Sequence, residues 1–168
     1  MCSSDLIGDA RLGLMVAQGS LAIDPSDAAF LRGRLDRPSP RVKLGQALRG
    51  LAHASVDVSD GLLADLGHIC EQSRAGATVQ AADVPVSASA ERALAAVPQE
   101  RANLATFGDD YELLFTAAAS DRGRIQGLAA SLGVALTKIG TITEGDGVRV
   151  LDTQGRPVEY VRKGFQHF

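Results

Sequence analysis

The segment 54–66, Ala-Ser-Val-Asp-Val-Ser-Asp-Gly-Leu-Leu-Ala-Asp-Leu, gathers three carboxylates and a hydroxyl at one junction. Its β-branched start predicts a short strand that runs directly into an amphipathic helix. Asp57 would end the strand, where open α/β sheets place ligands, and Ser59 and Asp60 would open the helix, where free N–H groups collect phosphates. Oxygen ligands of this kind suit Mg²⁺. The pattern therefore predicts a metal–phosphate site. The alternative, Ser59 as an N-cap and Asp60 as a first-turn acid, leaves Asp57 unexplained.

The segment 107–112, Phe-Gly-Asp-Asp-Tyr-Glu, is a second acidic group, placed before and within a predicted strand. A simple turn at Gly108 followed by two aspartates explains it in part. Ordinary turns, however, do not need two acids followed by a further acid in the strand. Turn and functional site stay open as alternatives here.

The chain ends with Arg-Lys-Gly-Phe-Gln-His-Phe, residues 162–168, which is unusual in a chain with only seven tyrosines and phenylalanines. The terminal aromatic side chains either cover the core or stack on a flat ligand. His53 and His68 have no Cys or His partner at metal-ligand spacing, and Cys70 lies on the apolar face of a helix. We therefore expect His53 and His68 to be structural or solvent-facing and Cys70 to be a buried thiol.

The order of helical and strand patterns favours an α+β fold with a mixed sheet packed by helices, formed as one domain over residues 1–168. The first helix opens without a preceding strand, which suggests a piece of a longer protein. Helices are predicted at 8–20, 24–35, 42–52, 60–73, 87–97, 99–105 and 120–132, and strands at 54–58, 78–81, 111–116, 134–142, 148–151 and 158–161.

Composition excludes several classes of function. Net charge is −3 with acids and bases interspersed, so no basic face predicts nucleic-acid binding. No apolar run reaches the roughly 20 residues of a membrane helix, and no signal-peptide pattern opens the chain. There is no Walker loop and no Gly-x-Gly-x-x-Gly. We expect a cytoplasmic protein without membrane or nucleic-acid partners.

Four motifs in order resemble the thiamine-monophosphate kinase family over nearly the whole chain. They are the loop 37–41 (Arg-Pro-Ser-Pro-Arg), segment 56–68, segment 108–115 and the tail 163–168. The resemblance covers the C-terminal domain of that family, whose superfamily includes aminoimidazole-ribonucleotide synthetase. It implies a separate N-terminal domain that carries further acidic ligands, much of the ATP site and the dimer interface.

The resemblance also implies roles for particular residues. Asp57 and Asp60 would be Mg²⁺ ligands, and Ser59 an ATP contact. Asp109 falls where the family has a glutamate that contacts thiamine phosphate, one methylene longer. Phe165 falls where an aromatic ring packs against the substrate's rings.

The implied reaction is ATP- and Mg²⁺-dependent phosphorylation of thiamine monophosphate to thiamine diphosphate, by direct in-line transfer in a homodimer. We expect this chain alone to be inactive, because it holds only part of the metal and nucleotide site. Two alternatives are a sister ATP-dependent synthetase of the superfamily and a non-catalytic metal- or ligand-binding remnant.

Overall fold

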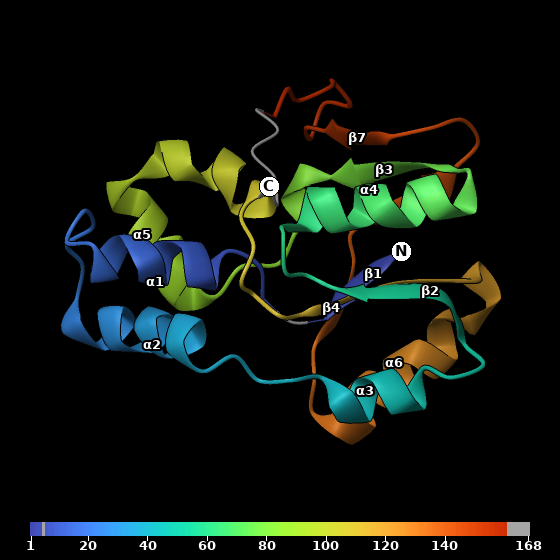
Figure 1. The fold of residues 1–168 in the computed structure, drawn as a ribbon, viewed down its shortest axis with the longest axis horizontal. Helices are drawn as coiled ribbons and strands as arrows, with labels where there is room; N and C mark the ends of the chain where they lie inside the picture. The colour runs from blue at the N-terminus through green and yellow to red at the C-terminus, as the bar shows by residue number, and fades with distance from the viewer. Residues whose placement is uncertain (5, 161–168) are drawn as a thin grey trace.

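The computed structural model describes residues 1–4 and 6–160 of the 168-residue chain, as a mixed arrangement of helices around two β-sheets (Figure 1). The α+β expectation is confirmed. In chain order the elements are β1 (Cys2–Ser4), α1 (Asp9–Ala17), α2 (Pro25–Asp36), α3 (Val42–Ala47), β2 (Ala52–Asp57), α4 (Leu62–Ser73), β3 (Gly76–Gln80), η1 (Ala81–Asp83), α5 (Ala88–Ala96), η2 (Pro98–Thr106), β4 (Leu113–Ala117), η3 (Ala119–Asp121), α6 (Arg122–Leu132), β5 (Leu136–Lys138), β6 (Gly140–Thr143) and β7 (Val148–Leu151).

The larger sheet has the strand order β2-β4-β1-β5 with every neighbouring pair antiparallel. Alternate residues of β4 face opposite sides, as the period of a strand requires. Phe115 packs with Leu44, Leu48 and Ile125 from the side of α3 and α6, while Leu114 belongs to the core on the other side. The sheet is thus covered on both faces next to the end of β2.

The smaller sheet has the order β6-β3-β7, with β3 antiparallel to β6 and parallel to β7. Helix α4 packs against both sheets through Leu62, Leu66 and Ile69, which recur at helical spacing and join one core cluster with Val79. This packing orients the helix that follows the Asp57–Asp60 turn.

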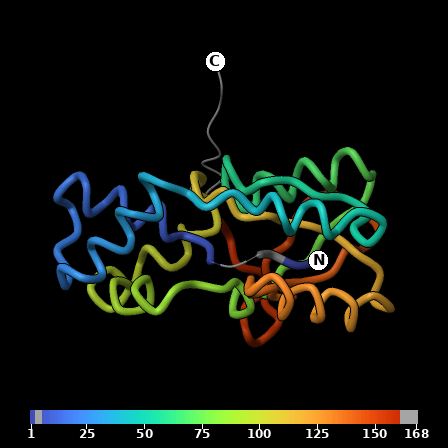
Figure 2. The backbone as a smooth tube through the Cα atoms, turned by 90° about the horizontal axis from the view of Figure 1, so that it is seen from below, coloured from blue at the N-terminus to red at the C-terminus, as the bar shows by residue number. Residues whose placement is uncertain are grey.

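Helices α1, α2 and α5 form a lobe beside the sheets, seen again from below in Figure 2. Its core contains Leu12, Leu31 and Leu94. A Cβ at Gly13 would overlap the carbonyl oxygen of Leu31, so glycine permits the close approach of α1 to α2. Asp24 caps α2 as predicted, since its carboxylate accepts the N–H of Ser26 at 2.8 Å.

The expectation that no strand precedes the first helix is wrong. Residues Cys2–Ser4 form β1, which lies between β4 and β5 and pairs with both. Three residues are too short for any alternation to mark a strand in the sequence, and the neighbouring strands supply the pairing.

Two other strand predictions are also wrong. The predicted strand 134–142 divides into β5 and β6, which belong to different sheets, and a Cβ at Gly140 would overlap the carbonyl oxygen of Thr78. Residues 158–160 form no strand, although Val158 donates its N–H to Val150 at 2.9 Å. Among the described residues, no helix is long and apolar enough to cross a membrane.

Candidate metal and phosphate site

Asp57 is the last residue of β2 and lies on the exposed side of that strand, which alternates between half-buried and exposed positions. It pairs with Leu113, the first residue of β4. The next residue, Val58, is fully buried, and Ser59 and Asp60 are half-buried in the turn before α4. The strand end and the turn therefore place two carboxylates and one hydroxyl within a short stretch of accessible surface.

The two acidic segments found in the sequence lie side by side. Three backbone hydrogen bonds continue beyond the paired strands. The carbonyl of Glu112 accepts the N–H of Val58 at 2.8 Å, the carbonyl of Val58 accepts that of Tyr111 at 2.9 Å, and the carbonyl of Ser59 accepts that of Asp109 at 3.1 Å. A Cβ at Gly108 would overlap the carbonyl oxygen of Ser59. The structure thus brings Asp109 to the turn that carries Ser59 and Asp60.

The backbone of the second segment has a positive φ at two residues that are not glycine. Asp109 and Tyr111 have φ angles of 68° and 51°, and with Arg74 they are the non-glycine residues of the described chain with positive φ. Aspartate tolerates this region, but a tyrosine there is uncommon. Strain of this kind concentrates at functional sites, so it favours the functional reading of segment 107–112 over a simple turn.

The backbone N–H groups of the turn are bound to a side chain of the protein itself. Asp65, in the first turn of α4, accepts the N–H groups of Ser59, Asp60 and Gly61 with its Oδ2 at 3.0, 3.1 and 3.2 Å. The helix begins at Leu62 with Gly61 as its N-cap, so the reading of Ser59 as the N-cap is wrong. The expectation that the N–H groups of Ser59 and Asp60 collect phosphate is wrong as well, because both donate to Asp65.

Asp60 and Asp65 also lie close to His68, one turn further along α4. One ligand atom from each residue falls within 4.8 Å of the others, and His68 Nδ1 lies 3.7 Å from Glu71 Oε2. His68 is exposed, as expected, but its position beside the turn was not predicted. The sequence signal was the i, i+3 spacing of Asp65 and His68 on one helical face.

Glu112 is a structural acid held by two arginines. Its carboxylate accepts two hydrogen bonds from Arg41, from Nε at 2.7 Å and from Nη2 at 2.8 Å. It accepts a third from Nη2 of Arg34 at 2.6 Å. Glu112 is only 1% exposed. These contacts join the residue before β4 to α2 and to the loop 37–41. Sequence reasoning missed the roles of both arginines, and the available signal was that a buried acid requires a counter-charge.

Asp110 is the second structural acid of the segment. Its two oxygens accept the N–H groups of Gly8 at 2.8 Å and Ala10 at 3.2 Å, which caps the N-terminus of α1. Burial raises the pKa of this carboxyl to about 7; the two hydrogen bonds oppose the rise and the charge of Asp9 adds to it. The charge of Arg34 also opposes the rise in the pKa of Asp110, and Arg34 Nε lies 3.5 Å from the carboxylate of Asp9.

This carboxyl predicts a pH dependence of stability. Between about pH 4 and pH 7 the folded protein keeps a proton on Asp110 that the unfolded chain loses, so raising the pH through this window lowers the free energy of unfolding. We expect the stability of Asp110→Asn, relative to the wild type, to rise by more than about 1 kcal/mol between pH 5 and pH 8. Urea unfolding at both pH values measures this.

Asp27→Asn is the matched control, because Arg92 and Ser89 lower the pKa of the Asp27 carboxyl to about 2. That group titrates below the tested range and should add no pH dependence there. Parallel pH profiles of Asp110→Asn and the wild type would contradict the assignment.

Three carboxylates at the junction have no partner among the described residues. Within residues 1–4 and 6–160, the side chains of Asp57, Asp60 and Asp109 form no hydrogen bond or ion pair, whereas the buried Asp65, Asp110 and Glu112 are all bound. Two carboxylates with a hydroxyl between them are hard oxygen donors, and Mg²⁺ prefers such donors together with water and substrate phosphates. The donors present therefore fit Mg²⁺.

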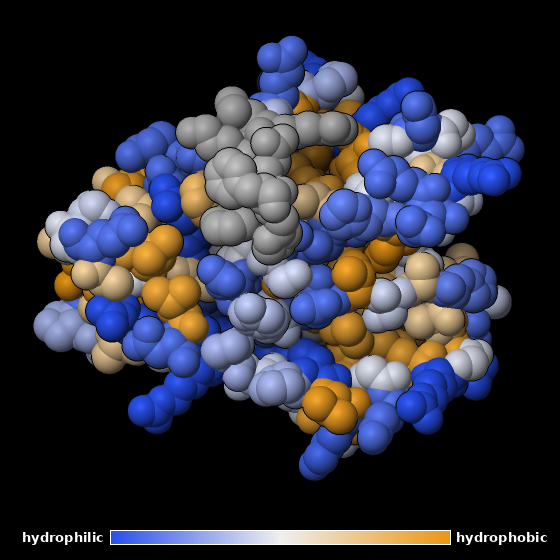
Figure 3. Space-filling model, in the orientation of Figure 1, coloured by the Kyte–Doolittle hydropathy of each residue, from blue (hydrophilic) through white to orange (hydrophobic). Residues whose placement is uncertain are grey.

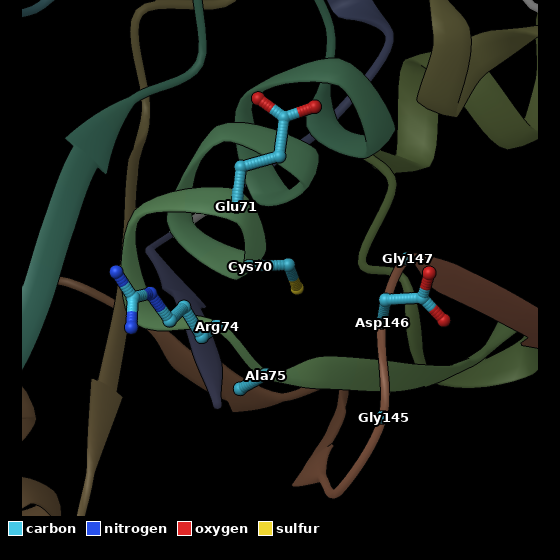
Figure 4. A pocket seen from close by; sticks show the side chains of 7 residues that line it. All are labelled: Cys70, Glu71, Arg74, Ala75, Gly145, Asp146 and Gly147. Carbon is cyan, nitrogen blue, oxygen red and sulfur yellow. The ribbon is translucent and has the colours of Figure 1, made fainter.

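Two surface pockets of the described chain lie away from this junction. The first, of about 290 Å³, lies between the end of α4 and the turn at Gly145–Gly147, with the thiol of Cys70 directed toward that turn (Figure 4). Apolar side chains gather between α4 and β2 (Figure 3), where the second, of about 280 Å³, is lined by Ala54, Ile69 and Ile142 among others. Neither pocket contains a predicted site residue. Phe165 lies outside the described residues.

Residues 28–153 match the family model "AIR synthase related protein, C-terminal domain". The chain belongs to this family. It is 40% identical over 163 residues to the thiamine-monophosphate kinase of Escherichia coli strain K12, covering 96% of this chain and 50% of that protein. The Haemophilus influenzae kinase is 40% identical over 169 residues, covering 98% and 51%. The chain thus spans about half the length of the curated relatives that it matches.

Solved structures agree with this assignment. The thiamine-monophosphate kinase of Stenotrophomonas maltophilia matches with 48% identity and a TM-score of 0.81 over 89% of this chain and 48% of that one. A protein called AaThiL, in complex with AMPPCP and TMP, matches with 29% identity and a TM-score of 0.82 over 99% and 50%. Escherichia coli HypE, a hydrogenase maturation protein, shares the fold at 17% identity and a TM-score of 0.74, over 96% of this chain and 48% of that one.

Proposed function

We propose that this chain is the C-terminal portion of a thiamine-monophosphate kinase, which phosphorylates thiamine monophosphate to thiamine diphosphate with ATP and Mg²⁺. The observation that carries the proposal is the junction itself. Asp57, Asp60 and Asp109 lie on two adjacent segments, and their carboxylates have no partner within the described residues, in a chain about 40% identical to such kinases. The resemblance further supports a cytosolic homodimer in the full-length protein.

In this reaction a phosphate oxygen of the substrate attacks the γ-phosphorus of ATP, the bond to the β-phosphate oxygen breaks, and ADP leaves. Asp57 and Asp60 would hold Mg²⁺, which would supply neutralisation of the negative charge on the phosphates. The hydroxyl of Ser59 would contact ATP, and Asp109 and Phe165 would orient thiamine monophosphate. Such a transfer requires alignment and charge stabilisation more than a strong base, so no covalent intermediate on the protein is needed.

Complementation tests the proposal. The purified chain should produce no measurable thiamine diphosphate alone, and should do so when mixed or co-expressed with the N-terminal half of the Stenotrophomonas maltophilia kinase. Asp57→Asn or Asp60→Asn should then reduce turnover about 100-fold or more, because a carboxylate ligand contributes several kcal/mol to stabilising the transferred charge. Asp83→Asn, an exposed acid in η1, is the control and should keep wild-type turnover.

Robust turnover by the 168-residue chain alone would contradict the predicted dependence on a second half. The alternatives give other results in the same assay. Calorimetric binding of thiamine monophosphate without turnover, even beside the N-terminal half, would identify a non-catalytic remnant. Turnover of a different phosphorylated substrate would identify a sister synthetase.

A further inference from the structure

The carboxylate of Asp65 lies at the centre of the turn that carries the predicted cation ligands. One oxygen, Oδ2, accepts three successive N–H groups, those of Ser59, Asp60 and Gly61. The residue is 2% exposed. Burial raises the pKa of this carboxyl, while the three hydrogen bonds favour its charged form.

Three consecutive N–H groups that converge on one anion form a nest, a backbone concavity that binds an anionic group. Gly61 has a φ of 118°, and a Cβ there would lie 2.9 Å from the carbonyl carbon and oxygen of Thr106. The N-cap residue, Gly61, has no side chain to accept the free N–H groups at the start of α4. The carboxylate of Asp65 accepts the N–H groups of the turn before the helix in its place.

The opposite edge of the turn is fixed by segment 107–112. The carbonyl oxygens of Val58 and Ser59 accept N–H groups from Tyr111 and Asp109. The turn is therefore held through its amides by Asp65 and through its carbonyls by the second acidic segment. Asp60, whose own carboxylate has no protein partner within the described chain, takes its position from these contacts.

We propose that Asp65 is a positioning residue for the cation site, holding the backbone of residues 59–61 in the conformation that presents Ser59 and Asp60 to the ion. The inference rests on the proposed function, because the cation is the one assigned to Asp57 and Asp60. Since Oδ2 already accepts three donors, Asp65 acts through the turn. Loss of a side chain that supports ligands in this way commonly weakens metal affinity 10- to 100-fold.

The test uses the full 168-residue chain mixed with the N-terminal half of the Stenotrophomonas maltophilia kinase, which supplies the remaining ligands, and Mn²⁺ as a paramagnetic substitute for Mg²⁺. Asp65→Ala should weaken Mn²⁺ binding, measured by electron paramagnetic resonance, on the order of 10- to 100-fold. It should also accelerate hydrogen exchange at the amides of Ser59, Asp60 and Gly61. Asp27→Asn removes a buried, ion-paired carboxylate in α2 and is the matched control. It should lower thermal stability without changing either readout.

Wild-type Mn²⁺ affinity in a folded Asp65→Ala would overturn the inference and leave the proposed function standing. If the wild-type chain in this mixture binds no Mn²⁺ beyond that bound by the N-terminal half alone, the assigned cation site and this inference are overturned together, so the two failures are distinct. Should Asp65→Ala not fold, Asp65→Asn carries the same criteria, because it keeps the shape and one acceptor oxygen but loses the charge.

Discussion

Replacing Glu112 by alanine should lower the free energy of unfolding by about 3–5 kcal/mol, a large part of the roughly 5–15 kcal/mol of a domain this size. The carboxylate is 1% exposed and is bound by both Arg34 and Arg41. Its removal takes the shared carboxylate from two largely buried guanidinium groups, of which Arg34 keeps Asp9 at 3.5 Å. Because these arginines belong to α2 and the loop 37–41, the change should also loosen the helical lobe from β4.

Urea unfolding followed by far-UV circular dichroism measures this effect. Glu91→Ala is the matched control, since Glu91 forms an exposed ion pair with Arg101 and exposed pairs contribute about 0–1 kcal/mol. The loss in free energy of unfolding for Glu112→Gln should fall between those of Glu112→Ala and Glu91→Ala, because the amide keeps one acceptor oxygen but no charge. A loss for Glu112→Ala no larger than that of Glu91→Ala would show that the paired arginines do not depend on this carboxylate.

Gly108→Ala should destabilise the protein by about 3 kcal/mol and disturb the candidate site directly. A Cβ at this position would overlap the carbonyl oxygen of Ser59, which is backbone and cannot rotate away. The two acidic segments would have to separate. The hydrogen bond from Asp109 to Ser59 should then lengthen, and with it the turn that carries Asp60 should move.

Thermal or urea unfolding measures the loss, and amide chemical shifts of residues 57–60 report the movement. Gly127→Ala is the control, because Gly127 lies within α6 with no atom within 4 Å of an added Cβ. That variant should gain up to about 1 kcal/mol from helix propensity. Equal stability of the two variants would mean that segment 107–112 tolerates the displacement.

The sequence predicted the elements that carry their own local signals. Asp24 followed by proline marked the start of α2, the apolar spacing from Leu62 to Cys70 marked α4, and Gly133 marked the end of α6 in the left-handed conformation. Each depends on contacts between residues near one another in the chain, where capping and periodicity act. The α+β class followed from the same patterns.

Strands that depend on distant partners were predicted less well. β1 is three residues long and is defined by its neighbours β4 and β5, and the run 134–142 divides where Gly140 passes against Thr78. A short strand has too few alternating positions to be recognised alone. Pairing across more than sixty residues decided both outcomes.

The candidate site shows the same division. The sequence by itself gave the residues predicted to bind metal and phosphate, because acidic side chains gather at a strand end and a helix start. Only the tertiary structure decided which acids are available. Backbone amides bind Asp65 and Asp110, and two arginines bind Glu112; the partners of Asp110 and Glu112 are distant in sequence. The carboxylates of Asp57, Asp60 and Asp109 have no partner in the described chain. The physical reason is burial: a buried carboxylate must find donors inside the fold, and an accessible one is left for a ligand.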